Sequence, residues 1–340
     1  MEFFDPRALK NQASQRLAAA SYDPKKLALI HSAVAVGVSL LLMLMNYLIN
    51  HQMESTISGL SGMGMRSILG TIQLGLQNIA SIAMPFWEIG LVFAALRIFR
   101  GEGTGPKDLL EGFRRFGSVL WLNLFQGLLY GGLAFVSLYF GTYIAMMLPS
   151  AQSAVALLME TAATADMAQV EQLIETMPVD QLQQLLIPMF AIFGVIFLLA
   201  AIPMFYRFRM ARFVIMDQPA VGAMAGMVIS SRMTRHCRRK LFRLDLSFWW
   251  FYLAAALAAV LAYADVLMSM LGVALPFHAE TFSLMVYVLG LLVTLVLYWR
   301  RNSYVQTTYA AAYEALRTRE PEPPKPAPQN VPWDNYYEQK

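Results

Sequence analysis

Residues 27–49 read LALIHSAVAVGVSLLLMLMNYLI and contain no Asp, Glu, Lys or Arg. A helix needs about 20 consecutive apolar residues to cross the hydrocarbon core of a bilayer, so this segment is long enough to be a membrane span. It is too long for the apolar region of a signal peptide and no small-residue cleavage site follows it, so we expect it to remain in the mature protein.

Five more long segments that are mostly apolar follow. Of the 340 residues, 57% are hydrophobic and only 14% are charged, whereas a soluble domain carries about 25% charged residues. Because the apolar residues fall in long blocks, we expect an all-α fold, a polytopic transmembrane helical bundle with amphipathic helices at its interface. The six expected spans are residues 27–49, 68–99, 116–148, 185–216, 244–272 and 282–299.

Lysine and arginine are confined to one side of these spans. Of the 26 basic residues, 25 fall in regions that six spans place on the same face, and only Arg66 falls on the other. The positive-inside rule therefore predicts six spans with both ends of the chain in the cytoplasm. The formal net charge of +4 then reflects topology and contact with anionic lipid headgroups, and we do not expect nucleic acid as a partner.

The two ends of the chain differ from the apolar blocks. Residues 1–26 are predicted to form a cytoplasmic amphipathic helix that starts at Asp5 and Pro6 and lies on the inner membrane surface. Residues 320–340 read EPEPPKPAPQNVPWDNYYEQK. So many prolines predict an extended, disordered cytoplasmic tail, which is a candidate docking segment for a cytoplasmic protein partner.

The six-span membrane domain, residues 27–319, contains one long loop on each side. The outer loop, residues 149–184, is acidic and carries no cation. Its pattern predicts two short amphipathic helices, and we favour a structured solvated loop over a binding lid. Its acidic residues are Glu160, Asp166, Glu171, Glu175 and Asp180.

The inner loop, residues 217–243, is basic. Asp217 and Pro219 predict a helix start, and Val221, Met224 and Val228 predict an apolar stripe along that helix. Each cation near an anionic leaflet contributes about 1 kcal/mol, so this loop is expected to engage lipid headgroups or a partner. The alternative is a topology signal without a ligand. The cations are Arg232, Arg235, Arg238, Arg239, Lys240 and Arg243.

Glu88 is the one acidic residue expected deep in the bilayer. It lies about 13 Å from the inner boundary marked by Arg97, from the 1.5 Å rise per residue of a helix. An acid there costs on the order of 3 kcal/mol, so Glu88 should face the bundle interior and have a partner. The candidates are His31, Asn123 and Gln126. The functional interpretation is a proton or substrate relay. The structural one is a hydrogen bond between helices, or a position nearer the surface than the expected span boundaries imply.

Small residues and prolines within the spans predict how the helices pack. Gly127 and Gly131 have the GxxxG spacing that lets helices approach closely, and we expect them to pack within the bundle rather than form a homodimer face. Pro85 and Pro203 are expected to kink their helices. The oligomeric state is left open.

The residues for catalysis and metal binding are missing from the sequence. Cys237 is the only cysteine and the four histidines are scattered, so no disulfide or zinc site is expected. No Ser-His-Asp set, HExxH motif or paired acids at a useful spacing occur, and RGEGTG at residues 100–105 lacks the GK[ST] of a phosphate loop. We expect no catalytic residue, no metal and no cofactor, and therefore no enzyme.

Several stretches resemble one family of bacterial integral membrane proteins, known as domain of unknown function 975. They are RALKNQASQRL (7–17), RGEGTGPKDLLEGFRRFG (100–117), IPMFYRFRMARFVIMDQPAVGAMAGMVISSRM (202–233), KLFRLDLSFWW (240–250) and TTYAAAYEAL (307–316). The resemblance implies a six-span bundle in the bacterial plasma membrane, and it supplies no catalytic residues.

Two functional hypotheses follow. The first is a non-enzymatic membrane protein whose basic inner loops engage anionic lipid or a cytoplasmic partner. The second is a small transporter or permease component with a relay at Glu88. A polar cavity that reaches Glu88 would favour the second, and a tightly packed apolar interior would exclude it.

Overall fold

The computed structural model describes residues 4–56, 60–149, 152, 156, 179–264, 267–268 and 279–318. These residues form helices and turns without a β-strand, which confirms the all-α class. The acidic outer loop, apart from its ends, and the proline-rich tail lie outside the described residues. The helices are α1 (Pro6–Ala18), α2 (Pro24–Thr56), α3 (Leu60–Arg100), the 3₁₀ helix η1 (Pro106–Leu110), α4 (Glu111–Arg114), α5 (Phe116–Met146), α8 (Val179–Phe208), α9 (Ala211–Asp217), α10 (Ala223–Thr234), α11 (Arg238–Leu246), α12 (Trp249–Ala262) and α14 (Ala279–Arg317).

Five helices among the described residues are long and apolar enough to cross a membrane, which indicates a multi-pass membrane protein. A sixth span results if α11 and α12, which meet at a bend of 66°, are counted as one. The contact between α1 and α14 favours six, because an even number of crossings returns the chain to its starting side. Helix α14 also contacts the start of α2, where the Ser303 hydroxyl donates to the carbonyl of Pro24 at 2.7 Å.

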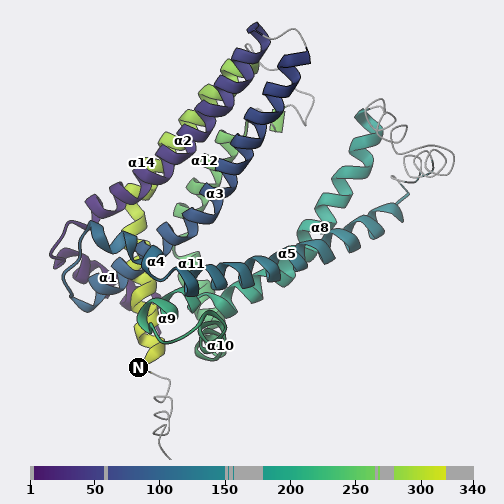
Figure 1. The fold of residues 1–340 in the computed structure, drawn as a ribbon. Helices are drawn as coiled ribbons and strands as arrows, with labels where there is room; N and C mark the ends of the chain where they lie inside the picture. The colour runs from purple at the N-terminus through teal and green to yellow at the C-terminus, as the bar shows by residue number, and fades with distance from the viewer. Residues whose placement is uncertain are drawn as a thin grey trace, which may run out of the picture.

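The long helices form two groups (Figure 1). Helices α2, α3, α12 and α14 lie side by side, while α5 packs along α8 and this pair diverges from the others. Both helices of the pair expose large apolar side chains, such as Leu128 at 73% and Leu199 at 72%. Such exposure is costly in water and suits a lipid environment.

The close approach of α5 to α8 does not use the predicted GxxxG pair. A Cβ added at Gly127 or Gly131 would meet no atom of the described chain within 4 Å, so the prediction that these glycines pack within the bundle is wrong. The close contact lies at Gly141, where an added Cβ would come within 3.0 Å of the Phe193 nitrogen. The close contact between α5 and α8 is therefore nearer the C-terminal end of α5 than the predicted glycine pair.

Glycine explains how α3 ends and what covers that end. Gly101 has φ +76°, and the amide of Glu102 donates to the carbonyl of Arg97 at 2.9 Å, which closes the helix with a left-handed cap. A side chain at Gly90 would collide with the backbone of Leu109, so glycine lets η1 lie directly on α3. The RGEGTG stretch is therefore a helix stop.

Helix α1 begins as predicted, since the carboxylate of Asp5 accepts from the amide of Arg7 at 3.1 Å. Its apolar face, predicted to lie on the membrane, packs instead on α3 and α14 through the buried Leu9 and Ala13. Lys10 donates to the carbonyl of Ser247 at 2.8 Å, and burial lowers the pKa of Lys10. This helix is thus part of the protein's own packing.

Candidate functional site

A polar cavity of about 320 Å³ lies where the two groups of helices meet. Residues of α2, α3, α5, α8, α9, α12 and α14 line it. Three of the four polar residues singled out in the spans reach it: Glu88, His31 and Gln126. The fourth, Asn123, bonds within its own helix, to the carbonyl of Val119 at 2.9 Å, and does not line the cavity.

Glu88 forms an ion pair with Arg212, with 3.2 Å between its Oε2 and the Nη1 of Arg212. Its side chain lines the cavity and is 56% exposed, so it has a charged partner but is not enclosed by the helices. No contact with His31, Asn123 or Gln126 serves as its partner in the described structure. Arg212 lies 124 residues away in the sequence. Because it is one of many cations in its region of the chain, the sequence did not indicate this pairing.

His31 is the buried polar group of the cavity, with an exposed fraction of 6%. Its ring stacks on Trp87 with centroids 5.8 Å apart, and Trp87 donates to the carbonyl of His31 at 3.0 Å. Neither ring nitrogen of His31 has a hydrogen-bond partner among the described residues. A buried polar group without a partner costs about 1–3 kcal/mol, so these nitrogens are suited to a ligand in the cavity.

Arg209 supplies a second cation to the cavity wall. Its guanidinium lies 4.6 Å from the ring centroid of Phe205 and 4.1 Å from that of Tyr309, and 3.6 Å from the carboxylate of Asp245. Stacking on two rings holds the planar group in a fixed orientation. The lining therefore contains two arginines and one carboxylate, together with tyrosine, asparagine and glutamine side chains.

The basic cluster of the inner loop lies at the surface, on α10, α11 and the turn between them. Arg232, Arg235, Arg239 and Arg243 are exposed, and Arg238 and Lys240 are half-buried. None of the six forms an ion pair within the described part of the chain. Helix α11 buries Leu241 and Leu244 and exposes large apolar side chains on its other side and at the bend into α12: Phe242, Leu246, Trp249 and Trp250.

Two residues of the apolar stripe predicted for this helix, Met224 and Val228, lie on the exposed side of α10. Met227 is 9% exposed and packs inward, whereas Met224 and Val228 are 63% and 45% exposed. The inward face is completed by small or hydroxyl residues, because Gly226 lets the helix approach Ile215 and Ser230 donates to the carbonyl of Arg207. Close packing against α8 and α9, more than apolarity, sets the orientation of α10.

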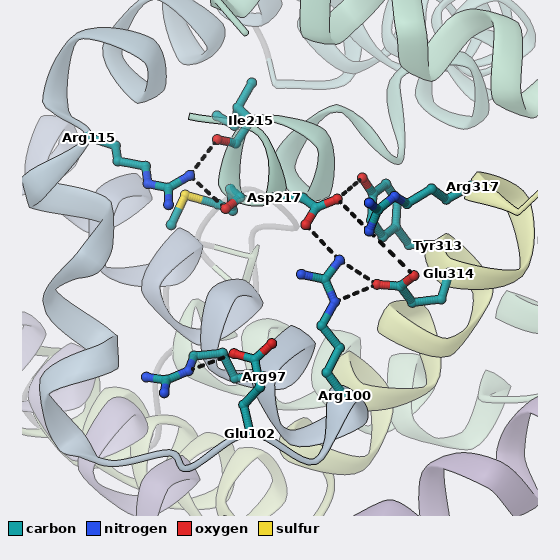
Figure 2. A network of polar contacts seen from close by, with 10 residues as sticks. Arg97, Arg100, Glu102, Arg115, Ile215, Asp217, Tyr313, Glu314 and Arg317 are labelled. Atoms are coloured by element: carbon teal, nitrogen blue, oxygen red, sulfur yellow. Dashed lines mark hydrogen bonds and ion pairs between the residues drawn. The ribbon is translucent and has the colours of Figure 1, made fainter. Parts of the chain in front are cut away.

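An ion-pair cluster joins α3, α9 and α14 on the basic side of the bundle (Figure 2). Arg100 lies 2.6 Å from Asp217 and 2.5 Å from Glu314, and Arg317 lies 3.2 Å from Asp217. The Tyr313 hydroxyl donates to Asp217 at 2.9 Å. Asp217 is only 5% exposed. The sequence marked it as a helix start, but it ends α9 and is the centre of this cluster.

Arg115 binds the same end of α9. Its Nη1 donates to the carbonyls of Ile215 and Met216 at 2.9 and 2.6 Å, which satisfies backbone acceptors in the last turn of the helix (Figure 2). The cluster and Arg115 together fix α9, and α9 carries Arg212 to the cavity. Nothing in the sequence indicates this role, because Arg115 and Arg212 occur among many other cations.

Among the described residues, no group of three or more His, Cys, Asp or Glu could hold a metal ion. No curated protein and no solved structure matches the chain. A family model does: residues 7–320 match the protein of unknown function family DUF975, and the chain belongs to this family.

Proposed function

We propose that this protein is a non-enzymatic membrane protein that binds a polar solute with an anionic group in the cavity, as a small transporter or permease component. The observation that supports it is the polar cavity lined by Glu88, Arg212, Arg209 and His31. Ionisable residues within spans are rare and tend to mark substrate or ion pathways.

The lining favours an anion. Arg209 and Arg212 both present a guanidinium to the cavity, and only Glu88 among the lining residues is a carboxylate, because Asp245 pairs with Arg209 from outside the lining. Guanidinium binds carboxylate and phosphate groups through paired hydrogen bonds. An anion on Arg212 would displace Glu88 from its ion pair.

The proposed location is the bacterial plasma membrane, with both ends of the chain in the cytoplasm. The distribution of lysine and arginine supports this orientation, because α1, α4, α10 and α11, which carry many of these cations, lie at the same end of the long helices (Figure 1). The cavity would then be nearer to the cytoplasmic side.

A panel of soluble carboxylates and phosphate monoesters tests the binding of a solute. Purified protein is heated with each compound, and a true ligand raises the melting temperature, since saturation at a hundred times Kd adds about 2.7 kcal/mol. Arg212→Gln should abolish the shift, and Arg235→Gln, which removes the same charge outside the cavity, should leave it intact. A shift that survives Arg212→Gln and Arg209→Gln would contradict the proposal.

Water access to the cavity tests the transport role. A cysteine at Gln126, with Cys237 replaced by serine, should react with a membrane-impermeant thiol reagent from at least one side of a sealed vesicle. Added ligand should slow this reaction. A cysteine that never reacts would exclude a transport pathway through the cavity.

A second candidate function is engagement of anionic lipid by the basic cluster. The observation that favours it is the exposure of four of its arginines, next to the exposed apolar side chains of α11 and the bend. Replacing Arg235, Arg239 and Arg243 by glutamine should lower the anionic fraction of the lipids that co-purify in mild detergent. Docking of a cytoplasmic protein on the C-terminal tail stays a prediction.

A further inference from the structure

A second hollow lies outside the cavity, as a groove between the membrane helix α5 and the surface helix α10. Its volume is about 540 Å³. Leu128 and Phe125 form one wall, Met224 and Val228 the other, and Arg207 stands at its end. Pockets of this size accommodate an organic molecule or part of a lipid.

The groove is apolar at one end and cationic at the other. Along α10, Met224, Val228 and Arg232 follow one another at intervals of four residues, so they form one line on the exposed side of the helix. Arg207 joins Arg232 at the cationic end and donates from Nε to the hydroxyl of Ser231 at 2.8 Å. That hydrogen bond holds the guanidinium of Arg207 beside the groove.

No carboxylate balances these two cations. The lining contains no acidic residue, and neither Arg207 nor Arg232 forms an ion pair within the described part of the chain. Both arginines are exposed, and Leu128 on the opposite wall is 73% exposed. A matching occupant therefore has one anionic end and one apolar chain.

We propose that this groove binds one anionic phospholipid of the surrounding bilayer, with its phosphate on Arg207 and Arg232 and an acyl chain along Met224 and Val228. Basic pockets between membrane helices on the cytoplasmic side are suited to anionic headgroups. The proposal rests on the lipid-engaging function above and places it in a defined site. A bound lipid would fill the space between α5 and α10 and so join these two helices.

The experiment uses the full chain in nanodiscs of mixed phosphatidylcholine and phosphatidylglycerol. Native mass spectrometry of the released protein counts retained phosphatidylglycerol and reports the oligomeric state. The double variant Arg207→Gln/Arg232→Gln should retain about 25-fold less of it, at about fivefold for each charge. The matched control, Arg235→Gln/Arg239→Gln, removes the same charge from the basic cluster outside the groove. It should lose only the diffuse part of the attraction and retain several-fold more phosphatidylglycerol than Arg207→Gln/Arg232→Gln.

The apolar wall is tested separately. Met224→Gln/Val228→Gln should lower retention of phosphatidylglycerol several-fold while both arginines remain. Glycerophosphoglycerol, which is the headgroup without acyl chains, should compete poorly with the intact lipid. If it competes as well as the lipid, the occupant is a soluble phosphate ester, and the proposal is overturned.

The remaining outcomes distinguish a failure of the groove as the lipid site from a failure of the lipid-engaging function. Equal losses in both arginine double variants would overturn the groove and leave diffuse attraction of lipid by the basic cluster. Unchanged retention in both would overturn the lipid-engaging function as well. A dimer that Met224→Gln/Val228→Gln dissociates would make a second copy of the chain the occupant, and it would also overturn the proposal.

Discussion

The ion-pair cluster around Asp217 and the cavity around Glu88 each contain a carboxylate beside arginine. The two carboxylates differ in how buried they are and in how many partners they have. Asp217 is 5% exposed and contacts Arg100, Arg317 and Tyr313. Glu88 is 56% exposed and has a single ion-pair partner, Arg212, among the described residues. A buried carboxylate with several partners holds helices together, whereas a half-exposed carboxylate with one partner can exchange that partner for a ligand.

The comparison extends to the neighbouring side chains. Glu314 joins the same cluster and shares Arg100 and Arg317 with Asp217, so each of these charges has more than one partner. Beside the cavity, His31 is buried with both ring nitrogens unpartnered. The ion pairs of the cluster therefore contribute more to the stability of the fold. The cavity contains polar groups that are free to bind a ligand.

The largest effect is expected from Asp217→Asn. The change removes a buried charge and leaves Arg100 and Arg317 with one carboxylate to share, which should lower the free energy of unfolding by about 3 kcal/mol. Thermal unfolding in detergent measures it with a thiol-reactive dye, because Cys237 is the only cysteine and is 2% exposed when folded.

Glu102→Gln is the matched control for this substitution. Glu102 pairs with Arg97 at 3.2 Å but is 49% exposed, so the same carboxylate-to-amide change should alter stability by less than about 1 kcal/mol. If both variants melt like the wild type, the cluster around Asp217 does not hold the helices together.

A smaller loss is expected from Arg100→Lys. Arg100 reaches Glu314 with both Nε and Nη2 and Asp217 with Nη2, whereas an ammonium keeps the charge without the planar fork. We expect about 1–2 kcal/mol less stability than the wild type, from the loss of one bridging contact. Melting curves recorded with the same dye check this value, and a loss as large as that of Asp217→Asn would mean that geometry matters as much as charge.

The sequence predicted the fold well because span length and cation placement are local properties. Apolar blocks of the required length predicted the long helices, and Asp5 with Pro6 predicted the start of α1. The expected fifth span, residues 244–272, contains the bend of 66° between α11 and α12, which the hydropathy of the sequence did not indicate. Leu244 and Phe248 are apolar but pack on the protein core, which hydropathy does not distinguish from a lipid-facing position.

The candidate site was predicted only in part, because its pairings join distant segments. Glu88, His31 and Gln126 were identified from polarity within apolar spans, and all three line one cavity. The partner of Glu88 and the cluster at Asp217 depend on how α9 packs. Nothing in a single sequence distinguishes Arg212 or Arg100 from the other inner cations.

His31→Phe tests the unused binding capacity of the cavity. Phenylalanine keeps the stacking on Trp87 and removes two buried nitrogens without partners, so stability should rise by about 1 kcal/mol. The melting temperature should increase, and the shift caused by a bound anion should shrink. His236→Phe, at an exposed position, is the control and should do neither. A destabilised His31→Phe protein would assign His31 a structural role.

Glu88→Gln should have the smallest effect on stability, because an ion pair with 38% and 56% exposed side chains contributes less than about 1 kcal/mol. Its effect on binding should have the opposite sign. Glu88 competes with an incoming anion for Arg212, so removing its charge should tighten anion binding several-fold in a titration followed by melting temperature. Weaker binding would mean that Glu88 contacts the solute itself, and the cavity would then select a zwitterion or a cation.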